Sequence, residues 1–248
     1  MISIEPSPKI VKVIFGKKTL AISKRVLLVW QNGGLPVYYF PMEDVRMEFL
    51  THSGRLTKEA GMGTKVSWNI AVGRKRTKAA AWSFENLPSS ADGIREHVAF
   101  SWSAMDSWHE EDEEVFVHPR DPHKRIDVLQ SSRNIKVLIN GKLLAESSSP
   151  MLLFETGLPT RYYLEMKDFR TKLLPSARTT MCPYKGEANY WSVTAEGQNA
   201  EDLVWGYKEP LPECGKIAGL FSFYNEKVDL YVEGVLQERP KLRWKKPS

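Results

Sequence analysis

The chain has 248 residues, 42% of them hydrophobic and 26% charged, and its formal net charge at pH 7 is +5. This composition is typical of one or two globular domains and excludes a largely disordered chain. The basic residues at 74–78 and 241–246 are separated by an acidic block at 110–114. We therefore expect no nucleic-acid partner, because nucleic-acid binding requires a contiguous basic face.

The cysteines and the apolar runs indicate the compartment and the cofactor requirement. Cys182 and Cys214 form no C-x-x-C pair, which excludes a zinc site of the usual spacing and a secreted disulfide framework. Residues 1–18 lack the apolar stretch of a signal peptide, and no apolar run approaches the ~20 residues of a membrane span. We expect a cytoplasmic protein with no membrane partner, no cofactor, no metal and no Cys182–Cys214 disulfide.

In chain order, the first half indicates strands joined by tight turns. A β-branched stretch at 9–15 predicts a strand that ends in a Gly16-Lys17 turn, and another strand is expected at 66–72. A short helix is predicted at 42–50. The proline-containing segment 118–123 indicates a linker, and the irregular spacing of its histidines favours a solvated or interdomain role over metal binding.

The second half follows the same order. A strand is predicted at 134–139, followed by an Asn-Gly dipeptide at 140–141 that is a strong hairpin signal. Further strands are expected at 190–194 and 203–207. A short helix is predicted at 166–174, with Asp168 near its start as a cap and Pro175 at its end.

The two halves are an internal repeat. Val11-Lys12-Val13 returns as Ile135-Lys136-Val137, and each half carries tryptophans at matching positions, with a spacing of 123 to 125 residues throughout. Such a constant offset over rare residues predicts two tandem copies of one mostly β module. We place the first copy and its linker at 1–125 and the second copy at 126–248.

Several motifs of the second copy resemble a known family. These are Cys182-Pro-Tyr-Lys-Gly186, Tyr190-Trp-Ser192, Val204-Trp-Gly-Tyr207 and the run from Ile217 to Tyr224. They resemble the tandem form of domain of unknown function 427, and the resemblance covers nearly the whole chain. It implies two β-tent (Mss4-like) domains, each a folded antiparallel sheet with one or two short helices.

The same resemblance implies little about chemistry. Relatives of the β-tent fold usually carry two C-x-x-C zinc knuckles, which this chain lacks, so only the sheet carries over. The family has also been labelled nucleotidyltransferase-like. The chain has no Asp-x-Asp pair after a Gly-Ser start to hold magnesium ions, and no Walker loop.

The sharpest candidate site is the Cys182-Pro-Tyr-Lys-Gly186 motif. A lysine three residues from a cysteine can favour the thiolate and make a nucleophile, and Lys185 or Tyr184 could act as acid/base groups. The motif is equally compatible with a simple turn. The second copy contains no histidine to activate the thiol. Glu155 and Arg161 flank Gly157-Leu-Pro159 and could face the mouth of a pocket.

An aromatic set accompanies this motif and is expected either to line a pocket or to fill the core. Its members are Tyr162, Trp191, Trp205, Tyr207 and Phe223.

Three hypotheses follow for the function. The first is a small-molecule-binding protein with an aromatic-walled pocket in the second copy. The second is a cofactor-independent isomerase, cyclase or lyase that uses Lys185, Tyr184 and Glu155. The third is a structural or protein-interaction module. A pKa of Lys185 tuned towards neutrality would favour the enzyme.

We expect any ligand or chemistry to belong mainly to the second copy, because the loop residues differ between the copies. In place of the cysteine motif the first copy has Gly61-Met-Gly-Thr-Lys65, which suggests Lys65 as the counterpart of Lys185. Function is disproportionately carried on loops, so the first copy is expected to act as a scaffold.

Overall fold

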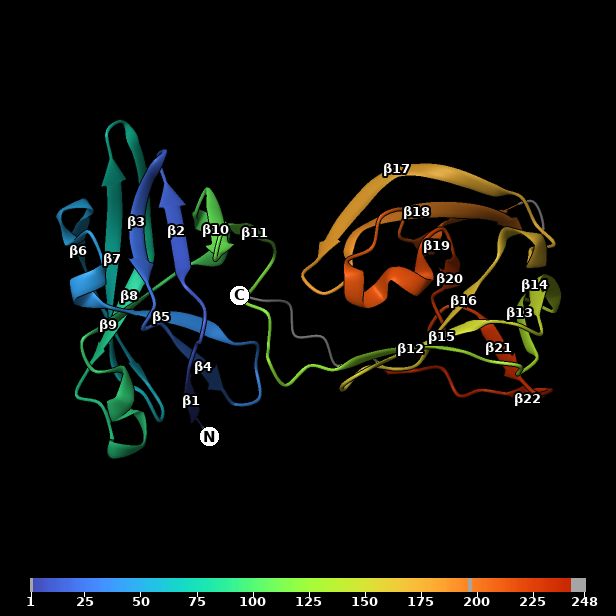
Figure 1. The fold of residues 1–248 in the computed structure, drawn as a ribbon, viewed down its shortest axis with the longest axis horizontal. Coiled ribbons are helices and arrows are strands. Elements are labelled where there is room, and N and C mark those ends of the chain that lie inside the picture. Colours follow the sequence, from blue (N-terminus) through green and yellow to red (C-terminus); the bar gives the residue numbers. More distant parts are fainter. Residues whose placement is uncertain (1, 196–197, 242–248) are drawn as a thin grey trace. The chain divides into compact units, whose positions relative to one another are not determined.

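The computed structural model describes residues 2–195 and 198–241. Its contacts divide the chain into two units, Met1–Asp121 and Pro122–Ser248, which Figure 1 draws in blue to green and in green to red. Each unit contains one seven-stranded and one four-stranded antiparallel sheet over its described residues. The predicted mainly β chain with two tandem copies of one module is confirmed.

The first unit orders its large sheet as β1 (Ile2–Pro6), β4 (Leu27–Gln31), β5 (Val37–Pro41), β9 (His97–Phe100), β8 (Lys75–Glu85), β7 (Gly63–Val72) and β6 (Leu50–Glu59). The small sheet runs β11 (Glu113–Val115), β10 (Ser107–Glu110), β2 (Val11–Phe15) and β3 (Lys18–Ser23). Short 3₁₀ helices connect the strands: η1 (Met42–Asp44), η2 (Met47–Phe49), η3 (Ser89–Ile94) and η4 (Trp102–Ala104).

The second unit has the same topology. Its large sheet runs β12 (Ile126–Gln130), β15 (Met151–Glu155), β16 (Arg161–Leu164), β20 (Phe221–Phe223), β19 (Gln198–Gly206), β18 (Gly186–Ala195) and β17 (Leu173–Cys182). The small sheet runs β14 (Lys142–Ser147), β13 (Ile135–Ile139), β21 (Asp229–Val232) and β22 (Val235–Leu236). The 3₁₀ helices are η5 (Met166–Asp168) and η6 (Pro212–Ile217).

The predicted turns form as expected from their backbone preferences. Gly16 and Lys17 both have positive φ, as do Asn140 and Gly141. This is the geometry of a two-residue hairpin whose twist matches that of the flanking strands. The two hairpins therefore close β2–β3 and β13–β14 in the same way.

The predicted helices at 42–50 and 166–174 are wrong in length. Helical turns occupy only Met42–Asp44, Met47–Phe49 and Met166–Asp168. Asp168 does accept a hydrogen bond from the backbone N–H of Glu165, as a cap would. Pro175 ends no helix and lies inside β17, which is an edge strand and is irregular there. A proline without an N–H is tolerated at an edge or bulge.

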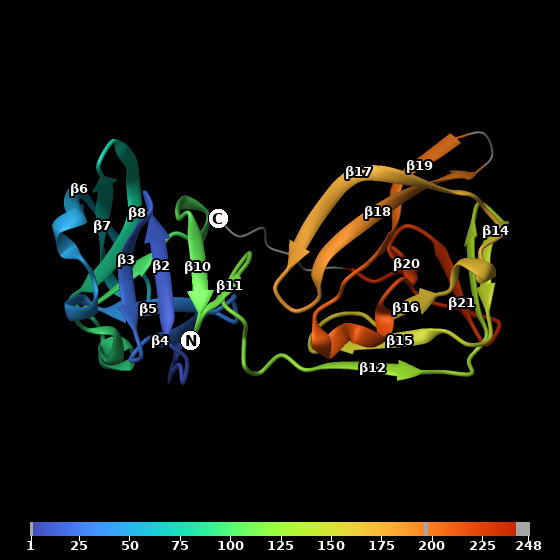
Figure 2. The same ribbon diagram turned by 45° about the horizontal axis from the view of Figure 1, so that its top comes forward.

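Each large sheet of the chain has a packed core on both faces. In the second unit one core fills the space between the two sheets and includes Leu164, Val204 and Leu230. The other includes Leu153 and Ile217 and is covered by η6, which contacts β12. Figures 1 and 2 show this large sheet folded over, with β17 and β18 on one side and β12 and β15 on the other.

Candidate functional site

Strand register gathers the candidate polar residues on one face of the large sheet of the second unit. Leu153 pairs with Arg161, and Tyr163 pairs with Ser222, which in turn pairs with Trp205. Paired residues point to the same side of a sheet, and residues two apart on a strand share a side. We call this side, which is packed under η6, the η6 face. Its polar and aromatic members include Glu155, Arg161, Tyr163, Trp205, Tyr207 and Ser222.

Lys185 reaches this face from the turn between β17 and β18. The hairpin closes with Cys182 opposite Gly186. Gly186 has a φ of +93°, and a Cβ there would lie 3.3 Å from the backbone oxygen of Glu209, so the position favours glycine. The backbone N–H of Leu211 donates to the Lys185 carbonyl at 3.1 Å. The sequence of the motif thus fixes the turn and directs the lysine inward.

Lys185 and Glu155 form a buried ion pair. The Lys185 Nζ lies 2.5 Å from the Glu155 Oε2, and the two side chains are 9% and 6% exposed. Burial lowers the pKa of Lys185, but the charges of Cys182 and Glu155 outweigh it, and the net pKa is raised above its usual value. Lys185 is therefore an ammonium ion at neutral pH and not a free base.

Both cysteines lie beside this pair as free thiols. The Cys182 Sγ is 3.8 Å from the Lys185 Nζ. Cys214, the third residue of η6, is fully buried and its thiol donates to the Tyr184 carbonyl at 3.7 Å. Burial raises the pKa of Cys214 to about 11. Cys214 is thus a neutral thiol, while half-buried Cys182 lies beside the ammonium group of Lys185.

A buried hydroxyl group on the face lacks a partner. Among the described residues, the Ser222 Oγ has no hydrogen-bond partner, whereas the fully buried Tyr163 hydroxyl lies near the Trp205 indole N–H. Burial also raises the pKa of both Tyr163 and Tyr207, so both phenols stay neutral. Unpaired buried hydroxyls cost free energy, and they are groups to which a ligand could bind.

A second ion pair stands at the edge of the same face. Arg161 donates to both carboxylate oxygens of Glu226, at 2.6 and 2.9 Å. Its guanidinium lies 5.3 Å from the centre of the Trp205 ring, and Tyr224 packs on that ring at 4.5 Å. Burial raises the pKa of Glu226, but the hydrogen bonds from Arg161 prevail and it is lowered. The Trp205 ring is thereby held in one place.

The structure does not bring together the whole predicted aromatic set. Trp205 and Tyr207 lie on the η6 face, whereas Tyr162, Trp191 and Phe223 lie in the core between the two sheets. Alternation along the strands is the reason, because Tyr162 precedes Tyr163 and Phe223 follows Ser222. Tyr184 stays at the turn, half-buried, with its carbonyl near Cys214.

Sequence reasoning missed three groups that the fold brings to this face. Tyr163 could have been found because it lies two residues after Arg161 on one strand and therefore on the same face. Ser222 could have been found because it alternates with the apolar Phe221 and Phe223 on the next strand. Cys214 lies 32 positions after Cys182, and only the packing of η6 places both thiols near Lys185.

The first unit shows what the same face looks like without these groups. The turns close with Glu59 opposite Gly63 and with Cys182 opposite Gly186. Met62, buried at 1% exposure, therefore occupies the position of Lys185. The expectation that Lys65 is its counterpart is wrong, because the register moves the match by three residues. Lys65 instead pairs with Glu59 at 3.3 Å.

The other positions differ in the same direction. In the first unit the equivalent face, under η3, carries less polar or uncharged residues at the matching positions: Gln31 for Glu155, Phe84 for Tyr207, Ala91 for Cys214 and Ala99 for Ser222. Tyr39 occupies the position of Tyr163, and the Trp82 Nε1 donates to its hydroxyl at 3.0 Å, so the two repeats keep a tyrosine next to a tryptophan here.

Two further features bear on the class of the protein. Among the residues that the structure describes, no group of three or more His, Cys, Asp or Glu is arranged to hold a metal ion. In the same part of the chain, no helix has the length and apolar character needed to cross a bilayer.

A family model described as "Domain of unknown function (DUF427)" matches the chain twice, at residues 3–111 and 127–234. The two matches fall on the two repeats. No curated protein matches the chain.

Proposed function

The chain belongs to the family of domain of unknown function 427, in tandem form, and from this premise we propose that its second repeat binds a small molecule on the η6 face. The observation that carries the proposal is the substitution pattern between the repeats. Where the first repeat buries Met62, Ala91 and Ala99, the second buries an ion pair, a thiol and an unpaired hydroxyl.

Stability does not account for these polar groups. A buried ion pair costs desolvation energy, and its replacement by packed apolar residues is often neutral or stabilising by about 1–4 kcal/mol. Each unsatisfied buried hydroxyl costs a further ~1–3 kcal/mol. The first repeat has the same strand order without them. Buried groups that lower the stability of a fold in this way are typical of binding and active sites.

The charge state of Lys185 favours binding over proton abstraction. Because its pKa is raised, Lys185 offers three N–H donors, one of which is taken by Glu155. An anionic or strongly accepting group of the ligand would bind this ammonium, and a flat part would pack against Trp205. Tyr163 and Ser222 would supply further hydrogen bonds.

Entry requires the turn at 183–185 to move. This turn lies at the face, and its contacts include the Lys185–Glu155 ion pair, the Leu211 N–H to the Lys185 carbonyl and the Cys214 thiol to the Tyr184 carbonyl. Each of the two hydrogen bonds contributes only about 0.5–1.5 kcal/mol, so the buried ion pair is the contact that resists opening.

The enzyme hypothesis rests on a single contact, the 3.8 Å between the Cys182 Sγ and the Lys185 Nζ. An ammonium ion beside a thiol can generate a nucleophile. In that case Cys182→Ser would abolish turnover of the bound compound and leave its binding intact. A compound that binds and leaves unchanged would support binding alone.

The test uses the residues of the first repeat as replacements. The full chain and the double variant Lys185→Met/Glu155→Gln are incubated with a small-molecule extract, and bound masses are read by native mass spectrometry. We expect a bound mass on the wild type that the double variant loses while its unfolding is unchanged or improved. A variant at the first repeat, Met62→Leu, is the matched control and should keep the ligand. Equal masses on all three proteins, or none on the wild type, would contradict the proposal.

A further inference from the structure

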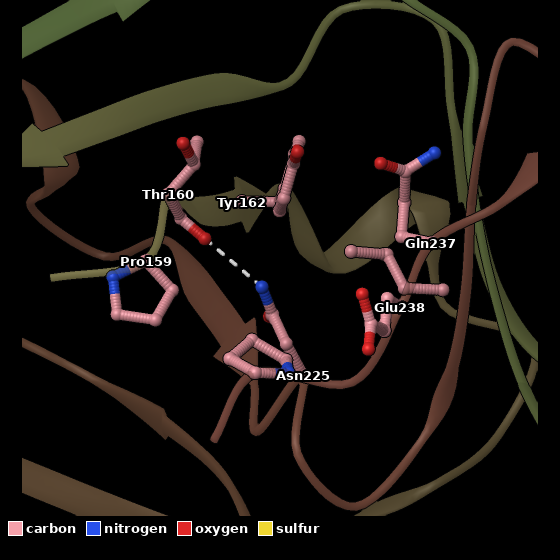
Figure 3. A pocket seen from close by; sticks show the side chains of 8 residues that line it. Pro159, Thr160, Tyr162, Asn225, Gln237 and Glu238 are labelled. Atoms are coloured by element: carbon pink, nitrogen blue, oxygen red, sulfur yellow. Dashed lines mark hydrogen bonds between the residues drawn. The ribbon is translucent and has the colours of Figure 1, made fainter. Parts of the chain in front are cut away.

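The second unit contains a cavity of about 150 Å³ on the opposite side of β16 from Lys185. Figure 3 shows it between the start of β16, the loop after β20 and the residues after β22. Its walls include Pro159, Tyr162, Asn225, Leu230, Gln237 and Glu238. None of these residues belongs to the η6 face.

In the first unit the corresponding space is filled by two stacked indoles. Trp102 and Trp108 stack at 4.5 Å with their planes 4° apart. Trp108 pairs with Val13 as Leu230 pairs with Val137, so Leu230 occupies the place of Trp108.

Trp102 is also replaced by a smaller residue, Asn225. It follows Ala99 by three residues as Asn225 follows Ser222, and Ala99 and Ser222 pair with equivalent tyrosines. Two indoles are thus replaced by a leucine and an asparagine. Because side chains fill protein interiors closely, this loss of volume leaves room for a guest.

The walls of the cavity are rich in hydrogen-bond acceptors. The Asn225 Nδ2 donates to the Thr160 carbonyl at 2.9 Å, which Figure 3 marks with a dashed line. The Gln237 Nε2 donates to the Val235 carbonyl at 2.9 Å. Both amides have therefore used a donor on the protein, and their side-chain oxygens remain as acceptors. Glu238 adds a carboxylate, and no ion pair joins it to a lysine or arginine within the described ranges.

The aromatic wall also differs between the repeats. The hydroxyl of Tyr38 donates to Glu110 at 2.5 Å in the first repeat. Its counterpart Tyr162 has Val232 in place of that acid, because Glu110 pairs with Val11 as Val232 pairs with Ile135. The second repeat has thus exchanged an internal acid for one at the mouth of the cavity, Glu238, which is exposed.

We propose that this cavity binds a small organic ammonium ion with one ring. A cavity of about 150 Å³ is large enough for a benzene-sized body. The ring would pack between Tyr162, Pro159 and Leu230, and the ammonium group would donate to the oxygens of Gln237, Asn225 and Glu238. A cation near an aromatic face gains a further attraction. This site is separate from the one proposed on the η6 face and does not rest on it.

Three probes of equal size and different charge test the proposal on the full chain. Benzylammonium, benzyl alcohol and benzoate are titrated at pH 7 and followed by ligand-observed NMR. We expect benzylammonium to bind roughly tenfold or more tightly than benzyl alcohol, because a charge-assisted hydrogen bond is about twice as strong as a neutral one. Benzoate should not bind. Binding of benzoate, or of none of the probes, overturns the proposal.

Variants then locate the site. Glu238→Gln should remove most of the preference for benzylammonium over benzyl alcohol. Asn225→Trp, which restores the residue of the first repeat, should abolish binding of both, and Leu230→Trp serves if that variant does not fold. Lys185→Met/Glu155→Gln should leave both affinities unchanged, which separates this result from the η6 face. An unchanged preference in Glu238→Gln, or full binding by a folded tryptophan variant, would refute the site.

Discussion

The two repeats share one fold and differ in what they bury. Both large sheets run in the same strand order, and both pack a 3₁₀ helix, η3 or η6, against one face. Behind that shared frame the first repeat keeps Met62 and Ala99, whereas the second holds the Lys185–Glu155 pair and the unpaired hydroxyl of Ser222. The comparison separates residues that the fold needs from residues that it only tolerates.

The difference is not a simple gain of polarity. On the opposite face the first repeat buries Glu110, paired with Tyr38 and with Lys9, where the second has Val232. Glu110 in the first repeat and Glu155 in the second are therefore buried acids at different places in the same fold. In the second repeat this leaves a cavity on one side of β16 and an ion pair on the other, so both candidate sites fall in the same unit.

The largest expected effect comes from removing one member of the ion pair. Lys185→Met alone leaves Glu155 buried without its partner and should lower the free energy of unfolding of the second repeat by about 3–5 kcal/mol. The double variant Lys185→Met/Glu155→Gln removes both charges and should be as stable as the wild type or more so. Urea unfolding of the full chain measures both. A single variant as stable as the double variant would show that the pair is not effectively buried.

The next effect is a dependence of stability on alkaline pH. The pKa of the Cys214 thiol is raised from 9.0 to about 11 by burial. Because the pKa is raised, the folded state holds the thiol proton up to a higher pH than the unfolded state does. The resulting contribution to the free energy of unfolding is complete below pH 9 and is lost as the pH rises towards 11. Cys214→Ala, which takes the residue of the first repeat, should reduce the loss of stability over this interval by about 1–2 kcal/mol.

The measurement is urea unfolding of both proteins at pH 8, 9, 10 and 11. The buried tyrosines and Lys185 also favour the protonated folded state, so some alkaline loss remains in the variant. Only the difference between the two curves belongs to Cys214. Parallel curves from pH 8 to 11 would contradict the assignment.

A smaller contrast concerns the reactivity of the two thiols. Half-buried Cys182 next to an ammonium ion should react with iodoacetamide at least ~10 times faster than buried Cys214 in the folded chain. Peptide mass spectrometry after timed quenching gives both rates. In Lys185→Met/Glu155→Gln the rate at Cys182 should fall, because the ammonium group 3.8 Å from its sulfur is gone. A Cys182 rate that does not depend on Lys185 would weaken the enzyme hypothesis further.

The fold could be predicted from the sequence because the two copies of the repeat can be compared, and each one checks the strands predicted in the other. The constant offset matched the strand at 9–15 with that at 134–139 and aligned the tryptophans of the two halves, and the Asn140-Gly141 turn has the backbone angles that its sequence requires. The lengths of the helices at 42–50 and 166–174 were overestimated, because apolar residues near the start of a strand fit the period of a helix as well as that of a strand. Pro175 was placed at a helix end because the edge position of β17 is a property of the whole sheet.

The candidate site was less predictable than the fold. The contact between Glu155 and Lys185, 30 positions apart, was not derivable from local pattern, although both residues had been singled out. Division of the aromatic set between two faces followed from alternation, which applies once the strand register is known. The match of Met62 with Lys185 also required the register of the hairpin, since letter-by-letter comparison favours Lys65.

The smallest expected effect is at Lys65, the residue that the sequence alone suggests as the equivalent of Lys185. Its ammonium lies 3.3 Å from Glu59 and 4.5 Å from the centre of the Trp82 ring, and its side chain is 29% exposed. Partly exposed ion pairs contribute about 0–1 kcal/mol, and an exposed cation–π contact about 0.5–1 kcal/mol. Lys65→Ala should therefore cost at most about 1–2 kcal/mol in urea unfolding and should leave ligand binding by the second repeat intact. If Lys65→Ala and Lys185→Ala lose the ligand equally, the repeats act as equals, and the asymmetry that the buried residues indicate has no functional meaning.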